Sequence, residues 1–105
     1  MKEIIDDIKD EYKQKYKCKE FANELEAGMK ENGISGERIK ATPKTGREYI
    51  YSDKFGIIGD NGFHEGIKIG DMIYDNLRPQ GIPYSEWVSD LGGEVYNLFE
   101  IISIW

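Results

Sequence analysis

The strongest constraint on the fold is a change of pattern near Gly36. Before it, apolar residues recur at three- and four-residue spacing in two stripes: Ile4, Ile5, Ile8, Tyr12 and Tyr16, then Cys18, Phe21, Ala22, Leu25 and Met29. This spacing places each stripe on one face of a helix. Gly33 lies just beyond the second stripe and is a plausible helix end. The junction from Tyr16 to Cys18 holds neither Gly nor Pro, so one bent helix and two helices are both possible.

After Gly36, short segments rich in Ile, Thr and Tyr alternate with turn residues. This pattern predicts strands at residues 38–42, 48–52, 56–58, 63–69, 72–76 and 95–104, with a turn at 60–62 and a loop at 79–83. Ser85 can cap a short helix that runs to Leu91 and ends at Gly92-Gly93. Helices first and strands afterwards predict an α+β fold, in which N-terminal helices pack on a small antiparallel sheet.

Length, charge and residue counts narrow the possible functions. A chain of 105 residues predicts one domain over residues 1–105. The net charge is 14 − 20 = −6, which disfavours binding to nucleic acid. One cysteine excludes an internal disulfide, and with one histidine it excludes the usual zinc sites, so we expect no metal and no cofactor. No apolar run reaches the ~20 residues of a membrane span. Residues 1–10 alternate acid, base and Ile, unlike a signal peptide.

Cys18 is the first candidate for chemistry. It is either a small buried residue of the helical stripe or a nucleophile. A helix that begins near Cys18 would direct its N-terminal amides at the sulfur and favour the thiolate, as Lys17 and Lys19 would too. The same amides could form an oxyanion hole. Gln14 is a conceivable side-chain donor to the oxyanion, although its spacing from Cys18 depends on the unresolved helix break.

His64 is the only histidine, and it opens a predicted strand after the turn at 60–62. It is either a satisfied structural histidine or the base that a cysteine nucleophile needs. Gly70-Asp71 predicts a two-residue hairpin turn, in which Ile69 pairs with Met72.

In that register, His64 and Asp75 lie diagonally on one face of the hairpin, within reach of each other. The Asp75 carboxylate would then fix the tautomer of the imidazole, while Asn76 would point to the other face. A competing interpretation of Asp75-Asn76 is the turn-like end of a strand. Trp87 could cover the pair from water, although packing in a helix core is the simpler interpretation.

Cys18, His64 and Asp75 thus supply a nucleophile, a base and an orienting carboxylate in chain order. In four segments the chain resembles the papain-fold toxin domains of bacterial polymorphic toxin systems: Tyr16–Ala22, Asn32–Ile39, Asn61–Ile67 and Tyr74–Ile82, followed by Trp87. The resemblance covers roughly residues 15 to 91. Such families often carry a second cysteine three residues after the nucleophile, where this chain has Phe21.

The resemblance implies a papain-like fold with catalytic residues at Cys18, His64 and Asp75. It implies acyl transfer at a protein amide, as in a peptidase, a glutamine deamidase or a transglutaminase. It also implies an effector domain that is delivered into the cytoplasm of a target cell, acts on a protein substrate there, and is neutralised in the producing cell by a cognate immunity protein. This domain would not insert into a membrane.

Two other functions stay open on the residues alone. A small acidic immunity or interaction protein without catalysis would fit the net charge. A nuclease toxin that uses His64 with nearby acids and lysines is the second, although the acidic balance and the single histidine argue against it. In both, Cys18 would be dispensable.

Overall fold

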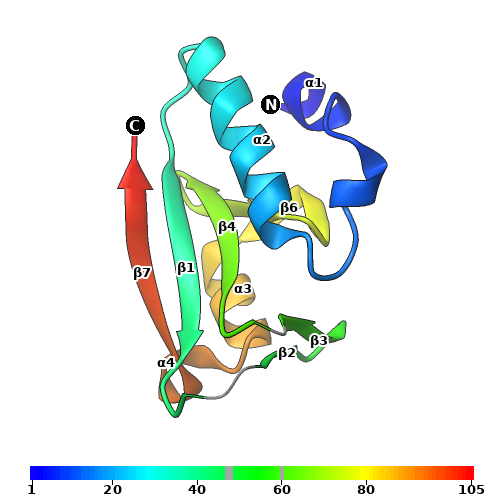
Figure 1. Cartoon of the computed structure of the whole chain (residues 1–105). Coiled ribbons are helices and arrows are strands. Elements are labelled where there is room, and N and C mark those ends of the chain that lie inside the picture. The colour runs from blue at the N-terminus through cyan, green and yellow to red at the C-terminus, as the bar shows by residue number, and fades with distance from the viewer. Residues whose placement is uncertain (47–48, 60) are drawn as a thin grey trace.

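The N-terminal third of the chain forms two helices joined by a short 3₁₀ turn. The structure is a computed structural model that describes residues 1–46, 49–59 and 61–105. In it α1 spans Lys2–Asp6, η1 spans Asp10–Tyr12 and α2 spans Cys18–Glu31 (Figure 1). Tyr16 adopts a φ of 69°, in the left-handed region, which a right-handed helix does not contain. Tyr16 thus lies at a turn just before α2, and the two-helix alternative is the correct one. The first stripe is not one helical face, because α1 ends at Asp6 and leaves Ile8 and Tyr16 outside any helix.

Five strands form the main sheet, and their order in space is β6-β5-β4-β1-β7. They are β1 Glu37–Pro43, β4 His64–Ile69, β5 Met72–Asp75, β6 Arg78–Pro83 and β7 Asn97–Ile104. All neighbouring strands pair antiparallel. Two further strands, β2 Ile50–Ser52 and β3 Gly56–Gly59, form a separate two-stranded sheet. The predicted α+β class, with N-terminal helices and an antiparallel sheet, is confirmed.

Each face of the sheet has its own apolar core. On the α2 side, buried residues of α1, of the turn that follows it, of α2 and of β4 pack together: Ile5, Ile8, Phe21, Ala22, Leu25, Met29 and Ile67. Figure 1 shows α1 lying beside the upper part of α2. On the other side the core joins β1, β5, the small sheet and the helix α3 Tyr84–Asp90: Ile39, Ala41, Ile50, Ile58, Ile73, Trp87 and Leu91. Among the described residues, no helix is both long and apolar enough to cross a membrane.

Several predicted elements differ from the structure. The loop expected at 79–83 is part of strand β6, because a proline is tolerated at the edge of a sheet, where its missing N–H breaks no ladder. The strand expected from Val95 begins at Asn97, because Gly93–Tyr96 forms the short helix α4. α3 starts at Tyr84 with Pro83 as its N-cap, so Ser85 caps nothing.

Parts of two other predictions cannot be compared with the structure. Of the strand expected at 48–52, Ile50–Ser52 is observed, whereas Glu48 lies outside the described residues. Asp60, the first residue of the predicted turn, also lies outside them. Gly62 within that turn adopts a φ of 88°, which suits glycine.

Candidate active site

Cys18 is the first residue of α2. The first intrahelical hydrogen bond runs from Phe21 N to Lys17 O at 3.0 Å. The amides of Cys18, Lys19 and Glu20 therefore precede the hydrogen-bonded ladder and point out of the helix end. The thiol is free of disulfide bonding, and the residue is 6% exposed. The predicted placement of the sulfur at a helix N-terminus is thus what the structure has.

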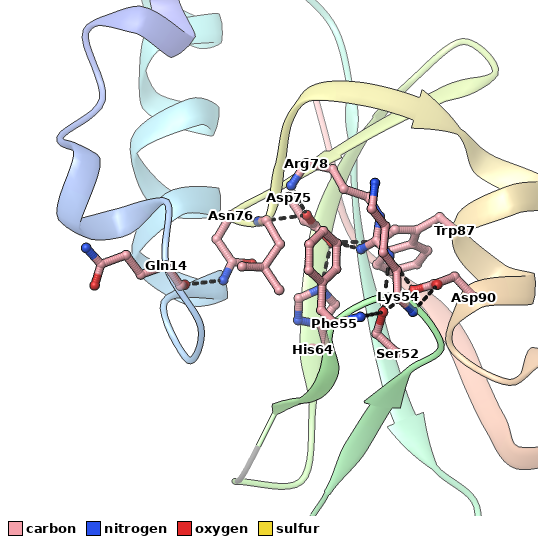
Figure 2. Close-up of polar contacts among 11 residues, drawn as sticks. Gln14, Ser52, Lys54, Phe55, His64, Asp75, Asn76, Arg78, Trp87 and Asp90 are labelled. Atoms are coloured by element: carbon pink, nitrogen blue, oxygen red, sulfur yellow. Dashed lines mark hydrogen bonds and ion pairs between the residues drawn. The ribbon is translucent and has the colours of Figure 1, made fainter.

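His64 and Asp75 are brought together by the predicted hairpin. Strand β4 pairs with β5 through Ile69 and Met72, as the Gly70-Asp71 turn predicts. His64 Nε2 and Asp75 Oδ2 are 2.9 Å apart, and both side chains are fully buried. Figure 2 shows the imidazole of His64 below the Asp75 carboxylate. The diagonal contact expected from the register is therefore present.

The second ring nitrogen of His64, Nδ1, is on the side of the ring away from Asp75. Among the described residues, Nδ1 has no hydrogen-bond partner of standard geometry, although it is buried. Burial by itself would lower the pKa of His64, but Asp75 and then the neighbouring Cys18 side chain raise it to about 9. Cys18 therefore lies beside the ring without a formed hydrogen bond to Nδ1. A buried nitrogen without a partner calls for an explanation.

The Asp75 carboxylate receives five donors. Oδ1 accepts from the backbone amides of Leu77 and Arg78, at 3.0 and 2.7 Å. Oδ2 lies 2.8 Å from Trp87 Nε1 and 3.2 Å from Arg78 Nη1, in addition to His64. Burial would raise the pKa of Asp75, but His64, Trp87 and Arg78 hold it below its usual 3.8. Asp75 is thus held as a carboxylate in a fixed orientation.

Arg78 links Asp75 to a second acid that the sequence did not reveal. Its Nη2 donates to Asp90 of α3 and, at 3.3 Å, to Ser52 Oγ of β2; Ser52 Oγ also donates to Asp90. The guanidinium lies 4.9 Å from the centroid of the Phe55 ring (Figure 2). The turn-like sequence Asp75-Asn76-Leu77-Arg78 was the one signal for Arg78, because an Asp at the start of a turn accepts from the amides that follow it. No local signal connects Ser52 and Asp90 to it.

Asn76 points away from Asp75 and connects the sheet to the segment before Cys18. Its Nδ2 donates to the backbone oxygen of Gln14 at 2.6 Å, and the side chain is fully buried. The Gln14 side chain itself extends away from the site (Figure 2). Gln14 therefore contributes its backbone to the site, and its side chain is not placed as an oxyanion donor.

Trp87 has both of the roles that were weighed for it. It is fully buried in the core on the α3 side. Its ring centroid is also 5.8 Å from that of His64, and its N–H binds Asp75. The ring thus packs the core and shields the His64–Asp75 pair from water.

Papain-like cysteine hydrolases share this arrangement. A cysteine at the start of a helix lies next to a histidine of an antiparallel sheet, and a carboxylate or amide binds the histidine nitrogen that faces away from the sulfur. The family described as papain fold toxin 2 matches residues 1–92, and the chain belongs to this family. The toxin family and the papain-like fold expected from the sequence are thereby confirmed. Comparison with curated proteins and with solved structures gave no match.

Proposed function

We propose that this toxin domain is a cysteine-dependent acyl-transfer enzyme that acts on a protein amide. Cys18 is the nucleophile, His64 the general base and acid, and Asp75 the group that orients and charges the imidazole. The observation that carries the proposal is the buried Nδ1 of His64. Among the described residues it has no hydrogen-bond partner, and the ring lies beside Cys18 while Nε2 is bound by Asp75. Nothing structural is gained by leaving that nitrogen unpaired.

The steps follow from these positions. His64 takes the proton of the thiol and holds a thiolate–imidazolium pair, and the sulfur attacks the carbonyl carbon of the amide. The free amides at the start of α2 stabilise the oxyanion. The tetrahedral intermediate collapses with loss of the amine, which takes its proton from His64, and a thioester remains. Water then regenerates the thiol by hydrolysis or deamidation, whereas a lysine amine would form a crosslink.

The family membership supports the biological setting of this reaction. As a toxin effector, the domain would act on a protein in the cytoplasm of a target cell after delivery, and a cognate immunity protein would protect the producing cell. Peptidase, glutamine deamidase and transglutaminase chemistry all use the same thioester, so the nature of the acceptor decides among them.

Alkylation of Cys18 against pH tests the nucleophile directly, because the chain has one cysteine. We expect wild type to react with iodoacetamide rapidly at pH 6, and His64→Ala to react about 100-fold more slowly there, since an ordinary thiol with a pKa near 8.5 is about 0.3% thiolate at that pH. Intact mass measures the labelling, and labelling in urea controls for the number of thiols. Reaction that rises only toward pH 8 to 9, with the same profile in both proteins, would make Cys18 a bystander.

Growth inhibition upon expression in bacteria tests the function that the thiol serves. Cys18→Ala should abolish the inhibition while changing the free energy of unfolding by only about 1 kcal/mol, because it removes one buried atom. An acidic binding protein or a nuclease would retain its effect in this variant. Growth inhibition unchanged by Cys18→Ala would therefore overturn the proposal in favour of one of those functions.

A further inference from the structure

A run of lysines surrounds Cys18 along the chain. Lys13, Lys15, Lys17 and Lys19 alternate with uncharged residues, and no acidic residue occurs from 13 to 19. The whole chain, with 14 basic and 20 acidic residues, has the opposite sign. The segment thus differs in charge from the rest of the protein at the place where the candidate nucleophile lies.

Three of these ammonium groups are available to a ligand. Lys15, Lys17 and Lys19 are exposed. Within the part of the chain that the structure describes, none of the three forms an ion pair. Lys13, by contrast, lies 3.6 Å from Asp10.

The three exposed lysines, Lys15, Lys17 and Lys19, are called the basic patch here, and it extends from the start of α2 toward the small sheet. Lys15 Nζ lies 4.0 Å from the point where Gly56 of β3 would carry a β-carbon. Lys17 and Lys19 flank Cys18 directly, and Glu20 is the nearest acid that follows along the chain. Lys15, Lys17 and Lys19 therefore place three exposed positive charges within three residues of Cys18 along the chain.

We propose that the substrate presents acidic side chains next to the amide that Cys18 attacks; this rests on the function proposed above. The warrant is charge complementarity between an exposed basic patch and an acidic protein segment. The lysines could also stabilise the thiolate, but that effect would speed every alkylating reagent equally. Attraction of an acidic ligand would speed only reagents that carry negative charge.

Paired alkylating reagents separate these two effects. Iodoacetate is anionic and iodoacetamide is neutral, and both react with the same sulfur. We compare the rate with iodoacetate divided by the rate with iodoacetamide. This ratio should be about fivefold lower in Lys17→Gln/Lys19→Gln than in wild type, which is the effect of one ion pair near 4 Å in water. The matched control is Lys2→Gln/Lys30→Gln, which changes the net charge equally. Lys30 lies about 18 Å along α2 from Cys18, beyond the Debye length of ~8 Å at 0.15 M salt. This control should keep the wild-type ratio.

A second arm asks whether the anion is a protein segment. A ten-residue glutamate peptide with one central glutamine should protect wild-type Cys18 from iodoacetamide, and the protection should be lost in Lys17→Gln/Lys19→Gln. A serine peptide of the same length and a single-stranded oligonucleotide are the comparisons. Equal protection by the serine peptide, or stronger protection by the oligonucleotide, would overturn the proposal.

The failure of this inference can be told from failure of the proposed function. Iodoacetamide labelling that depends on His64, combined with an iodoacetate ratio that ignores Lys17 and Lys19, would overturn the acidic-substrate proposal and leave the cysteine enzyme intact. Iodoacetamide labelling that ignores His64 would overturn the proposed function, and with it the inference that rests on it.

Discussion

Two buried charge networks lie on opposite faces of the same sheet, and neighbouring residues of β4 belong to one each. Glu65 faces α2, where its Oε1 is 2.6 Å from Arg38 Nε, and Arg38 Nη1 is 2.8 Å from Asn23 Oδ1 of α2. His64 faces the other way, toward Asp75 and Trp87. The two networks therefore share strand β4 and lie on its opposite faces.

The two networks differ in their cationic groups: each contains an arginine, Arg38 or Arg78, and the second also contains His64. An arginine stays charged at every pH that a protein experiences, and Arg38 is bound by Glu65, by Asn23 and at 3.5 Å by Glu26. His64 titrates, and within the described part of the chain its Nδ1 has no hydrogen-bond partner. Only the second network contains an imidazole, the group that ordinarily exchanges protons near neutral pH, so we interpret the first network as structural and the second as the candidate site for chemistry. Burial and charge alone would not have separated them.

The largest effect should come from removing the carboxylate of the His64 network. Asp75→Ala leaves the imidazole without its orienting partner, and loss of the carboxylate in comparable triads lowers the turnover rate by about 10⁴-fold. We expect growth inhibition to be lost, and iodoacetamide labelling at pH 6 to fall toward that of an ordinary thiol. Circular dichroism controls for folding. Wild-type labelling in a folded Asp75→Ala protein would remove Asp75 from the site.

Breaking the Arg38 network should change stability and not chemistry. Arg38→Met leaves the carboxylate of Glu65, which is 5% exposed, without a charge partner. Loss of one member of a buried pair costs about 3–5 kcal/mol. Urea unfolding measures this loss, and Arg38→Met/Glu65→Met should restore most of it because no buried charge is then unpaired. If Arg38→Met instead slowed labelling of the folded protein, the two networks would be coupled through the sheet.

The contact between His64 and Asp75 could be predicted from the sequence, because it lies within one hairpin. The two-residue turn at Gly70-Asp71 fixes the hairpin register, and the register brings His64 to Asp75. The position of Cys18 next to His64 depends on the turn at Tyr16, just before α2. Tyr16 adopts a left-handed backbone conformation there, which a tyrosine in the sequence does not predict. The N-terminal position of Cys18 in a helix was therefore an open alternative until the structure placed it.

The parts that could not be predicted depend on packing between distant segments. Arg78 meets Ser52 and Asp90 only because β2 and α3 lie on the same side of the sheet. Strand β6 was missed because its two prolines are typical of a loop, and nothing local says that this segment lies at a sheet edge. The catalytic roles of Cys18, His64 and Asp75 stay predictions.

The pKa of His64 offers a further way to compare the two networks. As the only histidine, it gives unambiguous imidazole resonances in an NMR titration. Its pKa is raised to about 9, so the ring should remain protonated through neutral pH and lose its proton only near pH 9. Asp75→Asn should lower this pKa, because the carboxylate is a main cause of the increase. Arg38→Met should leave it unchanged. Titration of wild type near the ordinary 6.5 would contradict the ion pair with Asp75.

The smallest effects should come from the two asparagines that connect α2 and its preceding segment to these networks. Asn76→Ala removes the hydrogen bond to the Gln14 backbone, at a cost of about 1–2 kcal/mol for a buried amide. Because that bond holds the chain just before Cys18, we expect labelling at pH 6 to slow by a few-fold, much less than in Asp75→Ala. Asn23→Ala removes one exposed acceptor of Arg38 and should cost under about 1 kcal/mol, with labelling unchanged.

The rate of iodoacetamide labelling and the free energy of unfolding in urea are measured for both asparagine variants. An Asn76→Ala protein that labels as fast as wild type would show that the Gln14 tether does not position the thiol. A larger loss for Asn76→Ala than for Asp75→Ala would transfer the orienting role from the carboxylate to the amide. The Asn23 variant sets the baseline, because it weakens the Arg38 network without touching the segment that precedes Cys18. Only a difference between the two asparagines can therefore be assigned to the position of the sulfur.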